Sequence, residues 1–417
     1  MKQSKQIELL APAGDLEKLK VAFAYGADAV YLAGEAFGLR SAAGNFSISE
    51  IEQGIEIAHN QGKKVYLALN TYPNQDEIKQ IAQYLKSIST LDLDAVIVAD
   101  PGVFTLAKEL TSFNLHISTQ SSVTNKEAVK FWKNQGASRI VLGREVSIAE
   151  AEEIKQSSGV ELETFIHGSM CMSYSGKCVI SNYTANRDAN RGGCVNSCRW
   201  EYSLTKDREE DSFSKSYVMN SKDLMAVDLI PELINAGVNS LKIEGRMKSF
   251  LYLANTVSTY RQIIDAVQTS KTITEEMRNS WIYRLNSNPN RGFSEGFLRH
   301  HAGAESVLYD SVRSPRSPKT EGRPNSNYIG LVREITDDYI VLQVKNPFKV
   351  EDVIAFLTHS GEEIELKVTF IKTIVNENIN ESRPNSVIFL EKHPLVKPLN
   401  VAYLQTPKSV ESYKEAV

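Results

Sequence analysis

Short apolar runs alternate with amphipathic stretches along the first 245 residues of the chain. The runs are rich in β-branched residues and are bounded by turn residues, which predicts buried strands. Capping-box patterns at Ser47–Glu50, Thr124–Glu127 and Ser147–Glu150 predict where three of the intervening helices begin. We expect eight strands, at residues 7–11, 29–34, 64–70, 95–100, 115–120, 139–144, 162–167 and 240–245.

Eight strand–helix units predict an α/β fold, because continuous apolar strands occur in parallel sheets that helices cover on both faces. The favoured arrangement is a (β/α)8 TIM-like barrel, and a doubly wound parallel sheet is the alternative. A long Cys-rich insertion at residues 168–225 separates the last two strands. In a barrel this insertion follows strand seven on the C-terminal face, where the active sites of this fold lie.

The composition of the chain changes after residue 310. Residues 311–327 are rich in Pro, Ser and basic residues, which predicts a linker. Residues 328–406 contain six short strand patterns separated by turn residues, which predicts a small all-β barrel. The expected organisation is therefore a catalytic barrel domain at 1–310, a linker, and a small C-terminal β-barrel domain.

All cysteines of the chain lie in one short segment of the insertion: Cys171, Cys178, Cys194 and Cys198. Their spacing, C-x6-C-x15-C-x3-C, indicates one shared role, since cysteines used as small core residues would be scattered. Reducing compartments disfavour structural disulfides, and thiolates are ligands for iron–sulfur clusters and for zinc. Only the last pair has the short spacing typical of zinc sites, so an iron–sulfur cluster is favoured over zinc, disulfides or redox thiols.

Composition and charge narrow the class of protein. With 42% hydrophobic and 24% charged residues, the chain has the composition of a globular protein. It has no apolar run of membrane-spanning length and no signal-peptide pattern, so we expect a cytoplasmic protein that does not bind membranes. The net charge of −4 excludes a general electrostatic attraction to nucleic acid, so any RNA site must be a local patch.

Polar residues follow several of the predicted strands at their C-terminal ends, where they would face the barrel mouth. These candidate substrate-binding residues are Arg40, Asn70, Gln120, Arg144, Glu244 and Arg246. Arginine binds carboxylates and phosphates through paired N–H donors, which favours a small anionic substrate. Structural interpretations stay open: Glu244 and Arg246 can pair with each other, and the amides can tie loops together.

Two residues near the first cysteine are the candidate catalytic residues. His167 precedes Cys171 by four positions and can donate a proton, although a buried structural histidine fits the pattern equally well. Tyr174 follows Cys171 by three positions. The chain lacks the HExxH, GxSxG, Walker A and GxGxxG motifs, so zinc proteolysis, serine hydrolysis and dinucleotide binding have no support. A Cys–His protease built from His167 and Cys171 would leave three cysteines unexplained.

The segment around the first two cysteines resembles a known family. Residues 163–181, ETFIHGSMCMSYSGKCVIS, are similar to the signature of the collagenase-like peptidases of unknown catalytic type. The runs ELLAPAGD, STQSSVTN, NRGGC, SCRW and KIEGRMKS are also similar to that family, so the resemblance covers essentially the whole chain. The chain length and the small C-terminal β domain resemble the branch of tRNA hydroxylation proteins.

The resemblance implies a tRNA-modifying enzyme that converts the wobble uridine to 5-hydroxyuridine and depends on prephenate and an iron–sulfur cluster. It puts the cluster, of the 4Fe-4S type, on the four cysteines, and it admits a paralogue as a protein partner. Other outputs of the family are the alternatives: hydroxylation of ribosomal RNA cytidine or of a ubiquinone precursor, and an older collagenase label. A redox centre above a polar barrel mouth suits hydroxylation better than proteolysis. Prephenate, a small dicarboxylate, would give the mouth arginines a role.

Overall fold

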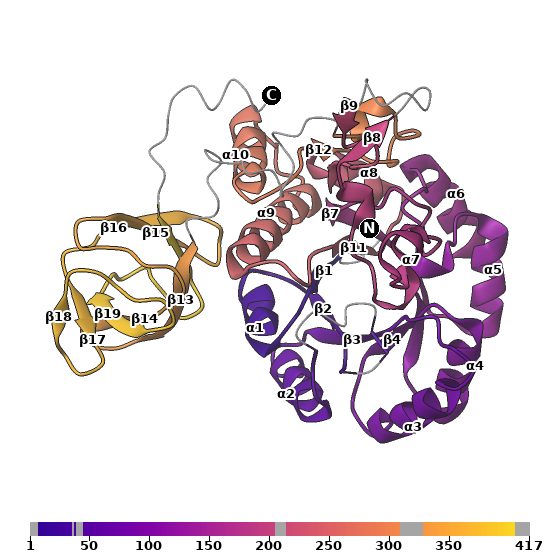
Figure 1. Cartoon of the computed structure of the whole chain (residues 1–417), viewed down its shortest axis with the longest axis horizontal. Coiled ribbons are helices and arrows are strands. Elements are labelled where there is room, and N and C mark those ends of the chain that lie inside the picture. The colour runs from indigo at the N-terminus through magenta and orange to yellow at the C-terminus, as the bar shows by residue number, and fades with distance from the viewer. Residues whose placement is uncertain (1–6, 36, 39–44, 205–213, 309–327, 405–417) are drawn as a thin grey trace. The chain divides into compact units, whose positions relative to one another are not determined.

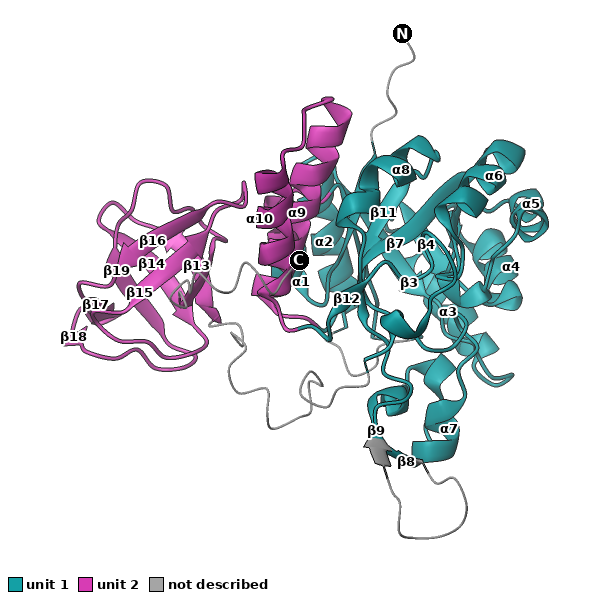
Figure 2. Ribbon diagram, turned by 90° about the horizontal axis from the view of Figure 1, so that it is seen from above, with its two compact units in different colours: residues 1–19, 28–247, 290–320 teal, residues 20–27, 248–289, 321–417 magenta. Residues whose placement is uncertain are grey.

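The structure, a computed structural model, describes residues 7–35, 37–38, 45–204, 214–308 and 328–404 (Figure 1). The chain divides into two compact units (Figure 2). Unit 1 comprises residues 1–19, 28–247 and 290–320, and unit 2 comprises residues 20–27, 248–289 and 321–417. The predicted linker, 311–327, lies outside the described residues. No helix in the described ranges is long and apolar enough to cross a membrane.

Unit 1 contains the predicted (β/α)8 barrel (Figure 1). Its eight strands pair in parallel in chain order, and the last strand also pairs with the first, which closes the sheet. The doubly wound alternative is wrong, because that sheet stays open at two edges. The strands are β1 (Glu8–Pro12), β2 (Ala29–Leu32), β3 (Lys64–Leu69), β4 (Ala95–Val98), β5 (Asn114–Ile117), β6 (Arg139–Val141), β7 (Glu161–Ser169) and β11 (Ser240–Ile243).

Helices follow the barrel strands on the outside of the barrel (Figure 1). Ser47 and Ser147 form the predicted capping boxes. The prediction at Thr124 is wrong: α5 is capped by Asn125, whose side chain accepts the N–H of Ala128 at 2.9 Å. The helices are α1 (Leu16–Ala24), α2 (Ile48–His59), α3 (Ile78–Ile88), α4 (Pro101–Leu110), α5 (Lys126–Gln135), α6 (Ile148–Ser158) and α8 (Ile230–Asn235).

The insertion after β7 consists of short elements connected by loops. Helix α7 (Ile180–Ala185) is followed by the 3-10 helices η2 (Ala189–Arg191) and η3 (Ser197–Arg199). Strands β8 (Tyr202–Leu204) and β9 (Ser214–Ser216) pair antiparallel. The chain then returns to the barrel through β10 (Asp223–Met225), which pairs antiparallel with the end of β7 and parallel with β12 (Phe293–Ser294). The insertion therefore begins and ends at the C-terminal end of β7.

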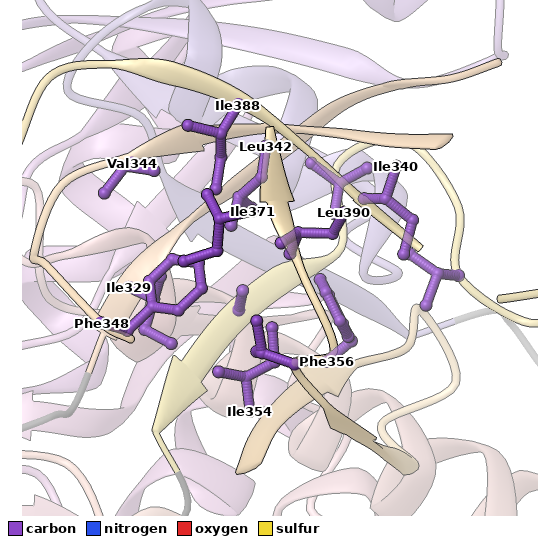
Figure 3. Close-up of a cluster of buried hydrophobic side chains, with 14 of the residues drawn as sticks. Ile329, Ile340, Leu342, Val344, Phe348, Ile354, Phe356, Ile371, Ile388 and Leu390 are labelled. Atoms are coloured by element: carbon purple, nitrogen blue, oxygen red, sulfur yellow. The ribbon is translucent and has the colours of Figure 1, made fainter. Parts of the chain in front are cut away.

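Unit 2 combines helices α9 (Phe250–Gln268) and α10 (Glu275–Asn286) with an antiparallel half-barrel. Buried apolar side chains such as Ile329, Leu342, Phe356 and Leu390 fill the half-barrel (Figure 3). Its eight strands are β13 (Tyr328–Ile335), β14 (Tyr339–Val344), β15 (Val353–Leu357), β16 (Glu363–Lys367), β17 (Ile371–Thr373), β18 (Asn378–Ile379), β19 (Val387–Glu391) and β20 (Val401–Leu404).

Candidate active site

Five of the predicted site residues line one pocket at the C-terminal ends of the barrel strands, which we call the mouth pocket. Its cavity volume is about 80 Å³. The sixth predicted residue, Arg40, lies outside the described residues. The five are Asn70 after β3, Gln120 in the 3-10 helix η1 (Thr119–Ser121), Arg144 after β6, and Glu244 and Arg246 after β11.

The two amides of the mouth pocket are tied to each other. Asn70 Nδ2 donates to Gln120 Oε1 at 3.1 Å and to Ser118 Oγ at 3.2 Å. The Tyr72 hydroxyl donates to the backbone carbonyl of Gln120. These bonds connect the loops that follow β3 and β5, so the amides do fix the loops, as their structural interpretation suggested.

The Arg144 guanidinium lies over an aromatic ring. Its guanidinium carbon is 4.1 Å from the centre of the Phe165 ring in β7. Its guanidinium makes no ion pair or hydrogen bond within the described ranges, whereas the backbone N–H donates to Ser175 Oγ at 3.2 Å. This cation–π contact holds the guanidinium over the ring and leaves its N–H groups available for a bound carboxylate.

The mouth pocket contains two further cations. Arg246 Nη2 donates to Asn45 Oδ1 at 2.9 Å. Lys242 in β11 also lines the pocket, with its Nζ 2.7 Å from Glu163 Oε1 and 4.5 Å from the centre of the Tyr31 ring. Lys242 is not among the site residues predicted from the sequence. The signal was present, because residues 242, 244 and 246 alternate with apolar or small residues and so share one face of an extended segment.

A buried network of charges lies inside the barrel. Glu163 is fully buried and accepts hydrogen bonds from both Lys242 and Arg139. The distance from Arg139 Nη1 to Glu163 Oε2 is 3.2 Å. Arg139 also pairs with Glu8 in β1. Burial alone would raise the pKa of Glu163, but the charges of Lys242 and Arg139 lower it below its ordinary value. Paired charges of this kind are costly to separate, so the network holds Lys242 in one position.

The four cysteines line a second pocket, the cysteine pocket, and all are free thiols. Gln120 and Arg144 line this pocket as well as the mouth pocket. The two pockets therefore share a wall. A molecule bound in the mouth pocket against Arg144 would lie beside whatever the cysteines bind.

A close approach of backbones holds the first two cysteines at that wall. Gly176, at φ +71°, lies so close to η1 that a Cβ atom would be 2.1 Å from the Gln120 carbonyl oxygen. The preceding residue, Ser175, donates its N–H to Glu145 Oε1 at 2.9 Å and accepts from the Ser122 hydroxyl through its carbonyl. Only glycine fits position 176, and the segment between Cys171 and Cys178 is fixed by it.

Side chains from the second half of the insertion hold Cys178 and the segment that contains Cys198 in place. Arg191 forms a two-pronged ion pair with Glu77, with both N···O distances 2.7 Å. Asn190 Nδ2 donates to the Cys178 carbonyl at 2.8 Å. Helix α7 packs on η3, which contains Cys198, through a Thr184–Ser197 hydroxyl pair at 2.5 Å. The insertion is thus a cross-braced structure rather than an open loop.

Burial favours the protonated form of the Cys171 and Cys198 thiols, and nearby arginines oppose this effect. Desolvation raises the pKa of the Cys198 thiol to about 11, with the Arg199 charge acting in the opposite direction. Desolvation by the pocket walls likewise raises the pKa of Cys171, and Arg144 opposes it. A bound metal centre would take thiolates and release these protons, so cations beside the thiols would assist binding.

The donor set fits an iron–sulfur cluster in its chemistry. Four thiols with no disulfide line a single open pocket, and each of the Cys171 and Cys198 thiols interacts electrostatically with the other cysteines. Within the described ranges, no three His, Cys, Asp or Glu side chains are already spaced to hold one metal ion. Four cysteines are the usual ligands of a cluster, which is larger than a single ion.

The two predicted catalytic residues occupy different environments. His167 is buried at the end of β7, with its ring 5.3 Å from that of Phe293, and it is absent from the linings of both pockets. Tyr174 is 65% exposed and also lies outside both linings. In unit 2, a further hollow between α9 and α10 is lined by Gln262 and Trp281 among others, without cysteine or histidine. The four cysteines and the five described candidate binding residues therefore line the two pockets at the barrel mouth and not this hollow.

The chain is similar to a known protein family over most of its length. The family model described as Peptidase family U32 matches residues 14–308, which include all four cysteines. The chain is 39% identical over 404 residues to tRNA hydroxylation protein P1 of Bacillus subtilis, covering 94% of this chain and 91% of that protein. It is 32% identical to the 23S rRNA 5-hydroxycytidine C2501 synthase of Escherichia coli, covering 82% of this chain and 51% of that one. It is also 32% identical to a collagenase of Porphyromonas gingivalis, covering 70% and 73%.

Proposed function

The chain belongs to peptidase family U32, and from this premise we propose that it is an enzyme that hydroxylates tRNA. The observation that carries the proposal is the wall shared by the two pockets, where Gln120 and Arg144 separate four free thiols from a polar mouth. Such an arrangement suits a redox centre that acts on a molecule held beside it.

The extent of similarity favours tRNA over the other substrates of relatives. The match to the tRNA hydroxylation protein of Bacillus subtilis spans nearly the full length of both chains. The match to the ribosomal RNA enzyme spans only half of that larger protein, and the match to the collagenase spans 70% of this chain. The similarity that supports a tRNA substrate therefore covers more of both chains than the similarity that supports the other substrates.

We infer that the four cysteines bind an iron–sulfur cluster of the 4Fe-4S type. When bound, the cluster supplies the electron transfer that hydroxylation requires. The residues of this chain would do the rest: the braced insertion holds the thiols, and Arg144 and Arg199 offset the cost of charging them. The product expected of this reaction is 5-hydroxyuridine at the wobble position.

The mouth pocket is proposed to bind prephenate as a small dicarboxylate co-substrate. Arg144 and Arg246 supply guanidinium groups, and Lys242, which is paired with Glu163, also lines the pocket. Two carboxylates would find separate partners among these cations, and Glu244 is the single acidic residue that lines the pocket within the described ranges. Bidentate arginine contacts give such a site its geometry.

A peptidase is the competing function, and a relative carries the name collagenase. Thiol proteolysis needs a cysteine and a histidine within hydrogen-bonding distance. His167 is 1% exposed and lines neither pocket, whereas Cys171 is exposed in the cysteine pocket. The geometry therefore gives the hydroxylase more support than the thiol protease.

Two assays on the same gene test the proposal. Nucleosides from tRNA of cells with and without the gene are compared by mass spectrometry, and the purified protein is incubated with gelatin. We expect loss of 5-hydroxyuridine-derived nucleosides in the deletion strain and no gelatin cleavage. Unchanged tRNA together with gelatin cleavage would overturn the proposal in favour of the peptidase.

A further inference from the structure

Exposed apolar side chains are concentrated beside the cysteine pocket. Of the twelve large apolar side chains that are exposed in the described ranges, four lie within residues 172–183. They are Met172, Tyr174, Val179 and Tyr183, and the last is 88% exposed. Single exposed apolar residues are common on proteins, but a cluster beside a functional pocket marks an interaction surface.

This segment is held rigidly. Tyr183 lies in α7, whose Ile180 and Ser181 line the cysteine pocket. The Ser181 hydroxyl accepts the N–H of Val195 at 3.2 Å, and its carbonyl accepts the N–H of Arg187 at 3.1 Å. Figure 2 shows α7 standing out from the ring of barrel helices in unit 1. The tyrosines are therefore presented on a fixed support, which lowers the entropy lost when they bind a partner.

The charge around these tyrosines is positive, although the chain as a whole carries −4. Residues 168–204 contain four basic residues and two acidic ones. Arg191 is committed to Glu77, but Lys177 and Arg187 are exposed and have no ion pair within the described residues. A surface that combines exposed tyrosines with available cations suits single-stranded nucleic acid, whose bases stack and whose phosphates are negative.

We propose that residues 172–187, which we call the pocket rim, bind single-stranded RNA, with Tyr174 and Tyr183 stacking on bases that flank the reacting one. The inference rests on the proposed function, since it assigns the surface that would bring tRNA to the site. An enzyme that modifies a base must reach it outside a stacked helix, so neighbouring bases need other stacking partners. Lys177 and Arg187 would contact phosphates and orient the strand.

The test is binding, measured by fluorescence anisotropy between full-length, cluster-loaded protein and an unmodified tRNA transcript. Tyr183→Ala and Tyr174→Ala should each weaken binding about five- to hundred-fold, the range found for losing one stacked base. The Trp variants at both positions should retain binding, because they keep a stacking surface. Phe131→Ala, which removes an exposed aromatic residue from α5, is the matched control and should bind as the wild type does.

Two further binding measurements test the proposal: the salt dependence of tRNA affinity and the affinity for an RNA duplex. Lys177→Ala and Arg187→Ala should each make the dependence of affinity on salt concentration shallower by about one phosphate contact. A fully paired RNA duplex should bind the wild type and the tyrosine variants equally weakly. Equal tRNA affinity of the wild type and both tyrosine variants would overturn the proposal.

These outcomes are distinct from failure of the proposed function. If the wild type binds and modifies tRNA while the rim variants behave like it, only the rim assignment is wrong. If the wild-type protein binds no tRNA and the tRNA of the deletion strain is unchanged, the proposed function is wrong, and the rim assignment is overturned with it.

Discussion

The guanidinium of Arg144 lies 4.1 Å from the centre of the Phe165 ring, at the wall that the mouth pocket and the cysteine pocket share. The contact with the ring positions the guanidinium without using its N–H donors. Because its charge also acts on the Cys171 thiol, the same residue can bind an anion and influence the cysteines. Arg144 is therefore the residue that links the two halves of the proposed site.

Replacing Arg144 tests the anion site. Charge-assisted hydrogen bonds contribute roughly 1.5–3 kcal/mol, so Arg144→Ala should raise the prephenate concentration needed for tRNA hydroxylation about ten- to hundred-fold. Arg144→Lys should recover only part of this loss, since lysine lacks the planar fork. The matched control is Arg299→Ala, which removes a surface arginine paired with Glu232 and Glu295. A normal prephenate response in Arg144→Ala with full iron content would place the anion elsewhere.

Replacing Gly176 tests whether its close contact with Gln120 stabilises the segment between Cys171 and Cys178. Gly176→Ala should destabilise the protein by about 2–5 kcal/mol, combining a left-handed backbone penalty with a clash at 2.1 Å. Gly159→Ala has a similar φ of +64° but nothing within 4 Å, so it should cost only about 1–2 kcal/mol. Urea unfolding measures both values. Equal losses of unfolding free energy in the two variants would mean that the close contact between position 176 and Gln120 does not destabilise the alanine variant.

The same pair of variants should differ in iron content. If the segment between Cys171 and Cys178 is fixed by the contact at Gly176, the Gly176→Ala protein should retain less iron than the Gly159→Ala protein. Iron and acid-labile sulfide are assayed after anaerobic purification. Full iron content in Gly176→Ala would show that the cysteines do not depend on this contact.

Glu163 should make stability depend on pH in acid. Its folded pKa is lowered from the ordinary value of 4.5, so its ionised form stabilises the protein above that pH. This contribution is lost as the pH falls below 4.5 and through the lowered folded pKa. Glu163→Gln should therefore cost about 3–5 kcal/mol at pH 7, because it leaves Lys242 without its partner, and the difference from the wild type should shrink toward pH 3. A difference that stays constant in urea titrations over this range would contradict the assignment.

The barrel was predictable because its strands are continuous apolar runs between turn residues, and burial on both faces leaves no other place for them. The half-barrel was predicted less completely. Six strands were expected there, but residues 363–371 divide into β16 and the start of β17, and β18 has only two residues, too few to show a pattern. Alternation identifies a strand only where it continues over several residues.

The residues of the mouth pocket were predictable because they follow strands whose C-terminal ends can be located in the sequence. Asn70, Gln120 and Arg144 follow three different strands, β3, β5 and β6, and the barrel brings the C-terminal ends of these strands to one face. The shared wall could not be predicted, because it depends on Gly176 meeting Gln120 across 56 positions of sequence. The buried Arg139–Glu163–Lys242 network was also missed, since a charged residue inside an apolar strand gives no sign of its partner.

The central claim is that tRNA hydroxylation depends on a cluster held by the four cysteines. The most direct measurement is nucleoside mass spectrometry of tRNA from a deletion strain that carries either the wild-type gene or single Cys→Ala variants at 171, 178, 194 and 198. We expect the wild type to restore 5-hydroxyuridine-derived nucleosides, and each variant to fail while accumulating as folded protein without iron. Full restoration by any of these variants, or unchanged nucleosides in the deletion strain itself, would contradict the account.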